Sequence, residues 1–136
     1  MTYQLEEPFL EEKGKITSQK EIGDNRMQVT YLSDGIMKGT IKVTNEGNFV
    51  SISKGGNATS AQGQGVITTK DGTETASYNF LQVGKVTKDG KPIFYGAAVW
   101  STDSKGKLAF LENMLSFFKG ELDEAGNFTS KDRELK

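Results

Sequence analysis

Short polar segments that carry a glycine at their third position recur along this chain. They are Asn45–Asn48, Lys70–Thr73, Lys88–Lys91, Ser104–Lys107 and Glu124–Asn127. Asp-Gly and related pairs between alternating runs are a strong hairpin signal, because the tight hairpin turns need the positive φ that glycine adopts easily. The chain between successive turns is long enough for one or two strands. The spacing therefore predicts an antiparallel up-and-down meander.

The runs between these turns are rich in β-branched and aromatic residues, and several alternate between apolar and polar residues. Such runs predict strands. They are Met27–Tyr31, Ile41–Thr44, Phe49–Ser53, Gly65–Thr69, Ala76–Val86, Ile93–Trp100, Phe117–Leu122 and Phe128–Arg133, with a weaker one near Gly14–Ile22. We therefore expect a single all-β domain over residues 1–136, with about eight or nine strands and residues 1–10 loosely ordered.

Glycines inside the expected strands favour a closed barrel over a flat sheet. They are Gly39, Gly63, Gly65, Gly84, Gly96 and Gly120. Glycine within a strand is otherwise unfavourable, and it often marks bulges, sharp coiling or the close approach of a ligand. Closure also removes the exposed edges of a meander. We expect a single antiparallel up-and-down β-barrel, with an open sandwich as the alternative.

The segment Lys107–Phe118 has an ambiguous pattern. Leu108, Leu111, Leu115 and Phe118 recur at helical spacing, which would suit an amphipathic helix. The segment is short, however, and hairpins bracket it. We expect a short helical turn near residues 108–113 followed by a strand, with a full helix as the alternative.

Composition excludes several classes of function. The chain has no His and no Cys, which rules out imidazole triads, thiol nucleophiles and Cys/His zinc sites. Its net charge of -1 argues against a nucleic-acid partner, which requires a basic surface. The first residues resemble no signal peptide, and no apolar run is long enough for a spanning helix. We expect a cytoplasmic protein with no membrane partner.

Phosphate-binding and metal-binding motifs are weak. Gly63 and Gly65 are two of three dinucleotide-motif glycines but open no helix. Asp103–Gly106 faintly matches an oxygen-ligand loop, but Lys105 and Lys107 oppose a cation. We expect barrel glycines and a solvated turn, with no metal and no cofactor.

Four segments carry a resemblance to a known family. They are Gln62–Val66, Ile93–Trp100, Lys107–Asn113 and Phe117–Asn127, in this order and with a hairpin at Asp71-Gly72. The chain resembles small uncharacterised bacterial and archaeal proteins with an allene oxide cyclase-like β-barrel, and more distantly the allene oxide cyclases and dirigent proteins. The resemblance implies a calycin-like lumen that holds a hydrophobic small molecule, and assembly as a homodimer or homotrimer.

One segment departs from the plant members of that family. They carry Gly-Gly-x-Gly-x-Phe before the penultimate strand, whereas Glu112–Gly120 lacks those early glycines. The departure disfavours cyclase activity and leaves the barrel unaffected.

Glu112 is the most interesting carboxylate, because apolar residues flank it on both sides. Without His, acid–base chemistry must use Asp, Glu, Lys or Tyr, and burial would raise the pKa of Glu112. We therefore consider Glu112 a candidate catalytic residue of an isomerase or cyclase. The alternative places it on the polar side of a turn.

Aromatic residues either fill the barrel or surround a ligand, because a barrel of eight strands has room for one small molecule. Along residues 93–100, Tyr95 and Val99 share one face while Phe94 and Trp100 share the other, and alternation does not tell which face points inward. Our leading hypothesis is binding of an apolar small molecule in the lumen. Tyr78, Tyr95 and Trp100 would form its walls, with Gln64, Asn79 and Glu112 as polar anchors. A structural oligomerisation module is the third hypothesis.

Overall fold

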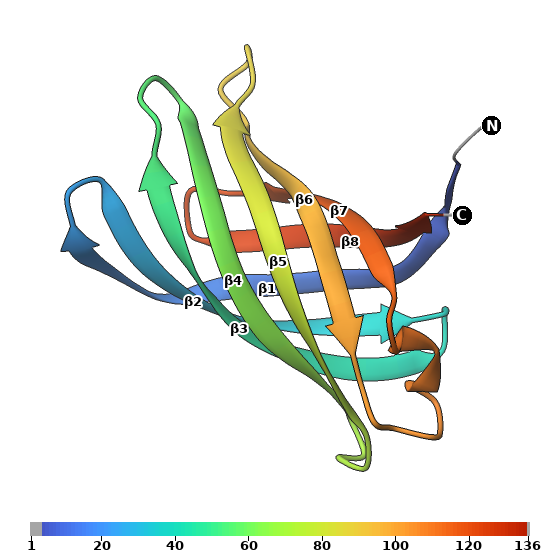
Figure 1. Ribbon diagram of the computed structural model, residues 1–136. Coiled ribbons are helices and arrows are strands. Elements are labelled where there is room, and N and C mark those ends of the chain that lie inside the picture. Colours follow the sequence, from blue (N-terminus) through green and yellow to red (C-terminus); the bar gives the residue numbers. More distant parts are fainter. Residues whose placement is uncertain (1–3, 136) are drawn as a thin grey trace.

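A computed structural model describes residues 4–135, and eight antiparallel strands form a closed barrel. Each strand pairs with its neighbours in the sequence, and β1 pairs with β8 to close the sheet (Figure 1). The strands are β1 (Leu5–Gly23), β2 (Arg26–Met37), β3 (Ile41–Ser53), β4 (Ala58–Thr69), β5 (Thr75–Val86), β6 (Pro92–Ser101), β7 (Leu115–Leu122) and β8 (Asn127–Leu135). The expected up-and-down barrel is confirmed.

Strand β1 is the longest and closes the barrel by pairing on both sides. Its register against β2 shifts between Ile16 and Ser18, and its register against β8 shifts on either side of Pro8. Such irregularities bend a strand and increase its twist, which a small closed barrel requires. Residues 5–10, which we expected to be loosely ordered, belong to β1, and Leu10 is buried. Residues 1–3 of that segment lie outside the described residues.

The predicted turns are partly right. Gly72, Gly90 and Gly126 have positive φ in the turns β4–β5, β5–β6 and β7–β8. The predicted turn at Gly47 is wrong, because this glycine lies inside β3. Gly39, which we expected inside a strand, has a φ of 76° in the turn β2–β3.

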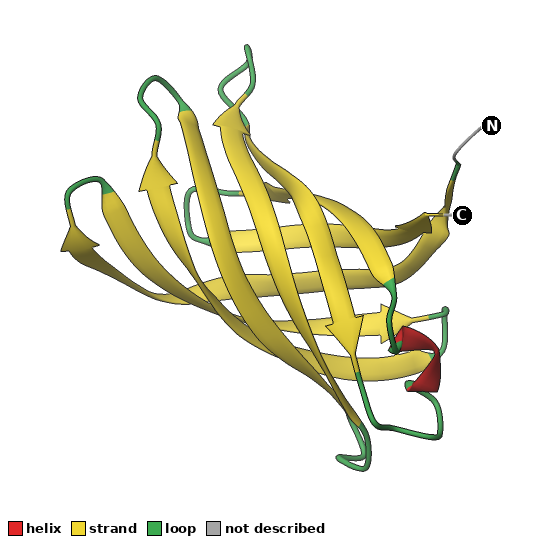
Figure 2. Cartoon of the chain, in the orientation of Figure 1, coloured by secondary structure: helices red, strands yellow, loops and turns green. Residues whose placement is uncertain are grey.

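The connection between β6 and β7 is a longer loop that contains the only helical element of the described residues. This element is η1, a 3₁₀ turn over Ala109–Leu111 (Figure 2), and it confirms the short helical turn expected near residues 108–113. Gly106 belongs to this loop and not to a tight hairpin. None of the described helices has the length and apolar character needed to cross a membrane.

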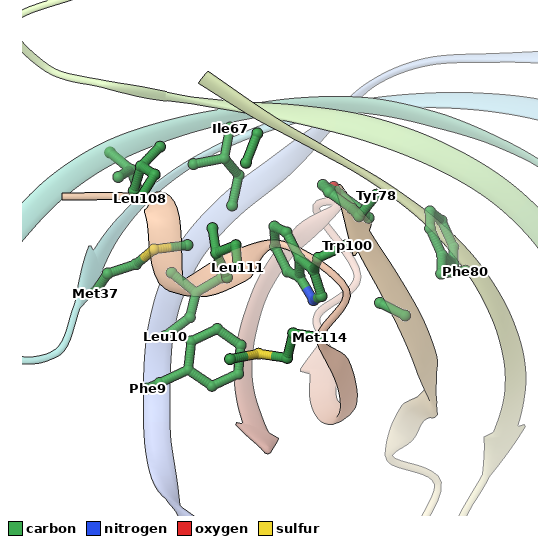
Figure 3. Close-up of a cluster of buried hydrophobic side chains, with 13 residues drawn as sticks. Phe9, Leu10, Met37, Ile67, Tyr78, Phe80, Trp100, Leu108, Leu111 and Met114 are labelled. Atoms are coloured by element: carbon green, nitrogen blue, oxygen red, sulfur yellow. The ribbon is translucent and has the colours of Figure 1, made fainter. Parts of the chain in front are cut away.

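Apolar side chains around η1 close one end of the barrel. Leu108 and Leu111 are fully buried, and they lie among Leu10, Met37 and Ile67 (Figure 3). The loop therefore acts as a hydrophobic plug, because its leucines take the place that water would occupy between the strand ends. Among the described residues no such plug covers the opposite end, where the cavity reaches Asn57 and Lys85, so the position of η1 gives the barrel a closed end and an open end.

Candidate functional site

A cavity of about 340 Å³ occupies the lumen of the barrel. Side chains from the inward faces of the strands line it, from Leu10 and Trp100 near the plug to the opposite end. There Gln19, Asn57 and Lys85 lie beside the turns and form a polar rim. This volume is at the lower end of the range of small-molecule sites.

Glycines on the inward face make room for the aromatic rings that surround the cavity. Gly47 lies opposite Tyr31 in the register of β2 and β3, and Gly65 lies opposite Tyr78 in that of β4 and β5. A Cβ atom at either glycine would collide with the facing tyrosine ring. The same pairing joins Gly14 to Phe128, Gly96 to Phe118 and Gly120 to Phe94. The strand glycines therefore determine where aromatic rings enter the lumen.

Six aromatic rings that line the cavity form a continuous aromatic belt. In the order in which they contact one another they are Tyr31, Phe49, Phe80, Phe118, Phe94 and Phe128, and neighbouring ring centroids lie 5.9 to 6.3 Å apart. Tyr31 and Phe80 also approach each other across the belt, with centroids 6.4 Å apart. The belt therefore narrows the passage between the polar rim and the closed end.

Below the belt, a polar network centres on Glu12 of β1. The Glu12 Oε1 atom accepts hydrogen bonds from Ser33 Oγ at 2.8 Å and Asn45 Nδ2 at 2.7 Å. The Tyr78 hydroxyl donates to Asn45 Oδ1 at 2.6 Å, and it is 2.5 Å from the Tyr31 hydroxyl. Strands β1, β2, β3 and β5 are thus connected through buried side chains.

A second carboxyl group, that of Asp132 in β8, lies with Glu12 on the lumen side of the plugged end. We call this part of the cavity the floor. The Ser116 hydroxyl donates to Asp132 Oδ2 at 3.2 Å and accepts from Trp100 Nε1 at 2.9 Å. Because Leu10 pairs with Asp132 and Glu12 pairs with Ser130, the two acids are diagonal neighbours on one face. Such neighbours have Cβ atoms at most about 7–8 Å apart, so long side chains can meet.

Burial raises the pKa values of both carboxyl groups, and the charge of Glu12 raises that of Asp132 further. Glu12 and Asp132 are only 8% and 5% exposed. Desolvation is the largest cause for each; hydrogen bonds from Asn45 and Ser33 oppose it at Glu12, and the charge of Glu12 adds to it at Asp132. Desolvation also raises the pKa of Tyr31 and of Tyr78. The floor is therefore a site where added negative charge is unfavourable.

Each of the two acids has one oxygen that remains open to the cavity. Among the described residues, Glu12 Oε2 and Asp132 Oδ1 accept no hydrogen bond. No fully enclosed side-chain oxygen or nitrogen in the described part of the chain lacks a partner. Both side chains line the cavity. These two oxygens therefore face accessible space and not packed protein.

The sequence-predicted ligand residues divide between the two faces of the barrel. Tyr78 and Trp100 line the cavity, and their rings are 4.7 Å apart between centroids. Gln64, Asn79 and Tyr95 are exposed on the outer face. The inward face of β6 is thus the one with Phe94 and Trp100, a choice that alternation alone left open.

Glu112 does not occupy the position that we considered for a catalytic acid. It follows η1 at the closed end and is exposed to solvent. The burial on which the candidate catalytic role rested is therefore absent, and Glu112 lies in the polar turn position that the alternative gave it. It does not line the lumen cavity.

The sequence analysis missed Glu12 and Asp132, which are the acids that face the lumen. Each lies within a charged run, Glu11–Lys13 or Lys131–Arg133, that is typical of a solvated surface. A signal was present in the alternation, because Glu12 shares its face with Leu10, and Asp132 shares its face with Phe128. Only the pairing of β1 with β8 brings the two acids together.

Comparison with solved structures supports the fold alone. A protein of unknown function from Clostridium acetobutylicum ATCC 824 superposes with a TM-score of 0.80 at 11% identity, covering 99% of this chain and 100% of that chain. A conserved protein of unknown function from Rhodopseudomonas palustris superposes with a TM-score of 0.75 at 13% identity, covering all of both chains. No protein-family model and no curated protein matches the sequence.

Proposed function

We propose that this protein binds an apolar small molecule in the lumen of its barrel. The observation that carries the proposal is the cavity of about 340 Å³, which has a plugged end, an aromatic wall and a polar rim at the other end. Ligand sites are typically concave and mostly apolar, with a few polar groups that orient the ligand. The floor around Glu12 and Asp132 supplies such groups.

The inward glycines add independent support. Gly84 lines the cavity near its open end, and Thr59 Oγ1 is the only side-chain atom near its missing Cβ. A side chain at this position would have to displace the Thr59 hydroxyl, which lies 2.7 Å from the place of the Cβ atom, so the glycine leaves this end of the lumen unfilled. The site is therefore available to a ligand that enters from the rim.

Native mass spectrometry of gently purified protein tests the proposal directly. We expect added mass of a small molecule that disappears on denaturation. In parallel, titration calorimetry with decanol, a slim neutral probe, should show saturable binding to the delipidated protein. A clean apo mass together with no decanol binding would overturn the proposal.

A matched pair of variants locates the binding site. Gly84→Phe places an aromatic ring in the open end of the cavity, whereas Val83→Phe adds the same ring on the outer face of β5. We expect Gly84→Phe to weaken decanol binding by about tenfold or more, equivalent to 1.4 kcal/mol. Val83→Phe should bind as the wild type does. Equal binding by both variants would place the ligand elsewhere.

A second candidate function, a module for self-association, is supported by one apolar patch. The outer face of β5 to β7 carries exposed apolar side chains that are cross-strand neighbours: Leu81, Val83, Tyr95, Val99 and Leu115. Contiguous patches of this kind often mark interaction sites. Sedimentation velocity at micromolar concentration should show a dimer or trimer that Val99→Lys dissociates. A monomer in the wild type would contradict this function.

A further inference from the structure

We infer that the ligand carries a cationic amine at one end, and that this group binds between Glu12 and Asp132 while the apolar remainder extends through the aromatic belt. This inference rests on the proposed lumen-binding function and specifies its ligand class. It stands on two observations that are independent of each other. One is the pair of open carboxyl oxygens on the floor, and the other is the shape and chemistry of the space above them.

The acidic groups of the floor determine which charge a ligand can carry there. Glu12 and Asp132 are both more than nine-tenths buried, and no Lys or Arg from the described residues accompanies them in the lower cavity. Lys85, the one basic residue that lines the cavity, lies at the rim. A buried acid without a cation is costly, whereas one that is paired and hydrogen-bonded is not. An ammonium group would supply the missing partner, whereas a carboxylate ligand would add negative charge to a floor that disfavours it.

The open oxygens provide the hydrogen-bond acceptors that such a group needs. An ammonium group has up to three donors and no acceptor. Glu12 Oε1 is already occupied by Ser33 and Asn45, which hold the carboxyl group in place. Ser116 holds Asp132 in the same way through Oδ2. The remaining oxygen of each acid is therefore oriented and free to accept.

The belt above the floor selects the shape of the ligand. Tyr31 and Phe80 are in edge contact, with ring centroids 6.4 Å apart. The cavity therefore continues beside this pair, and the space that the packed rings leave favours a slim alkyl chain over a bulky ring system. Aromatic faces also attract cations at short range. The path from rim to floor therefore suits a primary alkylamine, because the chain contacts the rings and the amine contacts the acids.

Binding of an amine should also be coupled to proton release. The titratable groups that face the floor are Glu12 from β1, Tyr31 from β2, Tyr78 from β5 and Asp132 from β8. Burial favours retention of a proton by both carboxyl groups, and the charge of Glu12 adds to this effect at Asp132. An incoming cation favours their ionised forms and expels that proton. A neutral ligand releases no proton.

Three probes of equal chain length test the inference by titration calorimetry near neutral pH: decylamine, decanol and decanoate. We expect decylamine to bind about tenfold or more tightly than decanol, because it gains charge-assisted hydrogen bonds. Decanoate should bind more weakly than decanol. Titration in buffers of different ionisation enthalpy should reveal proton release with decylamine and none with decanol.

Two variants separate recognition from folding. The double variant Glu12→Gln and Asp132→Asn keeps the shape and the acceptors of both side chains but removes their charge. It should lose the preference for decylamine and retain decanol binding, which itself shows that the barrel has folded. Glu11→Gln is the matched control, because Glu11 is the neighbouring residue of β1 and faces solvent beside Lys131. It should leave all three affinities unchanged.

The outcomes distinguish the inference from the function on which it rests. Equal affinity of decanol and decylamine in the wild type, or a preference that survives in the double variant, would overturn the amine and leave lumen binding intact. Tighter binding of decanoate would also overturn it. Failure of all three probes to bind would overturn the proposed function itself.

Discussion

Replacement of Asp132 by Asn should stabilise the protein, and the gain should depend on pH. Asp132 is 5% exposed, and its one hydrogen bond comes from Ser116. Its pKa is raised well above the ordinary value of 3.8, first by desolvation and then by the charge of Glu12. Asn retains the acceptor for Ser116 and has nearly the same shape. The variant therefore removes a buried charge and little else.

The direction of this pH dependence follows from the raised pKa of Asp132. Below 3.8 the carboxyl group of Asp132 is protonated in both the native and the unfolded chain, so its burial costs little. As the pH rises, the carboxyl group of Asp132 loses its proton first in the unfolded chain, while in the native chain it keeps its proton to a higher pH. The stability contributed by the protonated form is therefore lost as pH rises through the native pKa. The variant, which cannot ionise, does not lose it.

The magnitude follows from the surroundings of the carboxyl group. An unpaired buried charge costs about 3–5 kcal/mol, and the charge strengthens the bond from Ser116 by about 1 kcal/mol. We therefore expect Asp132→Asn to raise the free energy of unfolding by about 2–4 kcal/mol near pH 8. Near pH 4 the difference should be close to zero.

Urea denaturation of delipidated protein, followed by the fluorescence of Trp100, measures this difference across the pH range. Trp100 is the only tryptophan of the chain and is buried beside Ser116. Asp103→Asn is the control, because Asp103 is exposed, and it should change little at any pH. A gain of equal size at pH 4 and pH 8, or a loss at pH 8, would refute the reasoning.

Three further predictions concern the plug, the glycine pairs and one turn. Leu111→Ala should lower the free energy of unfolding by about 2–5 kcal/mol, because Leu111 is fully buried in the plug. Leu81 is 62% exposed, so Leu81→Ala should lower it far less in the same urea assay. Gly65→Ala should cost about 1–3 kcal/mol, because the new methyl group collides with the ring of Tyr78; an unchanged denaturation midpoint would contradict the pairing of glycines with aromatic rings. Hydrogen bonds from neighbouring threonines lower the pKa of Asp71 to about 2. Asp71→Ala should therefore be less stable than the wild type above pH 4, and this difference should vanish as the pH falls toward 2. An NMR titration of Asp71 with an ordinary midpoint would contradict this.

Two of the errors in turn placement, those at Gly47 and Gly39, share one physical cause. Asn45–Asn48 has the composition of a turn, but Gly47 lies in β3 because the ring of Tyr31 needs the space that a side chain would fill. Gly39 was expected inside a strand but turns the chain at a φ of 76°. Glycine serves both for positive φ and for close approach, and composition does not distinguish the two uses.

The candidate site was less predictable than the fold. Tyr78 and Trp100 were among the aromatic residues expected to form the walls of the lumen, and they line the cavity, whereas Tyr95, chosen on the same ground, is exposed on the outer face. Glu112 was chosen because apolar neighbours in sequence suggested burial, yet the end of η1 exposes it. Glu12 was passed over because charged neighbours in sequence suggested solvent. In both cases the neighbours in sequence were not the neighbours in space.

What the sequence determined by itself was the architecture: strands from period-two alternation, hairpins at Gly72, Gly90 and Gly126, and a short helical turn between β6 and β7. These are local properties, decided by a few consecutive residues. Tertiary structure decided which face of β6 points inward, and it brought Glu12 and Asp132 together on the floor of the lumen. That meeting joins the two ends of the chain, and it depends on the register in which β1 pairs with β8, which no local pattern encodes.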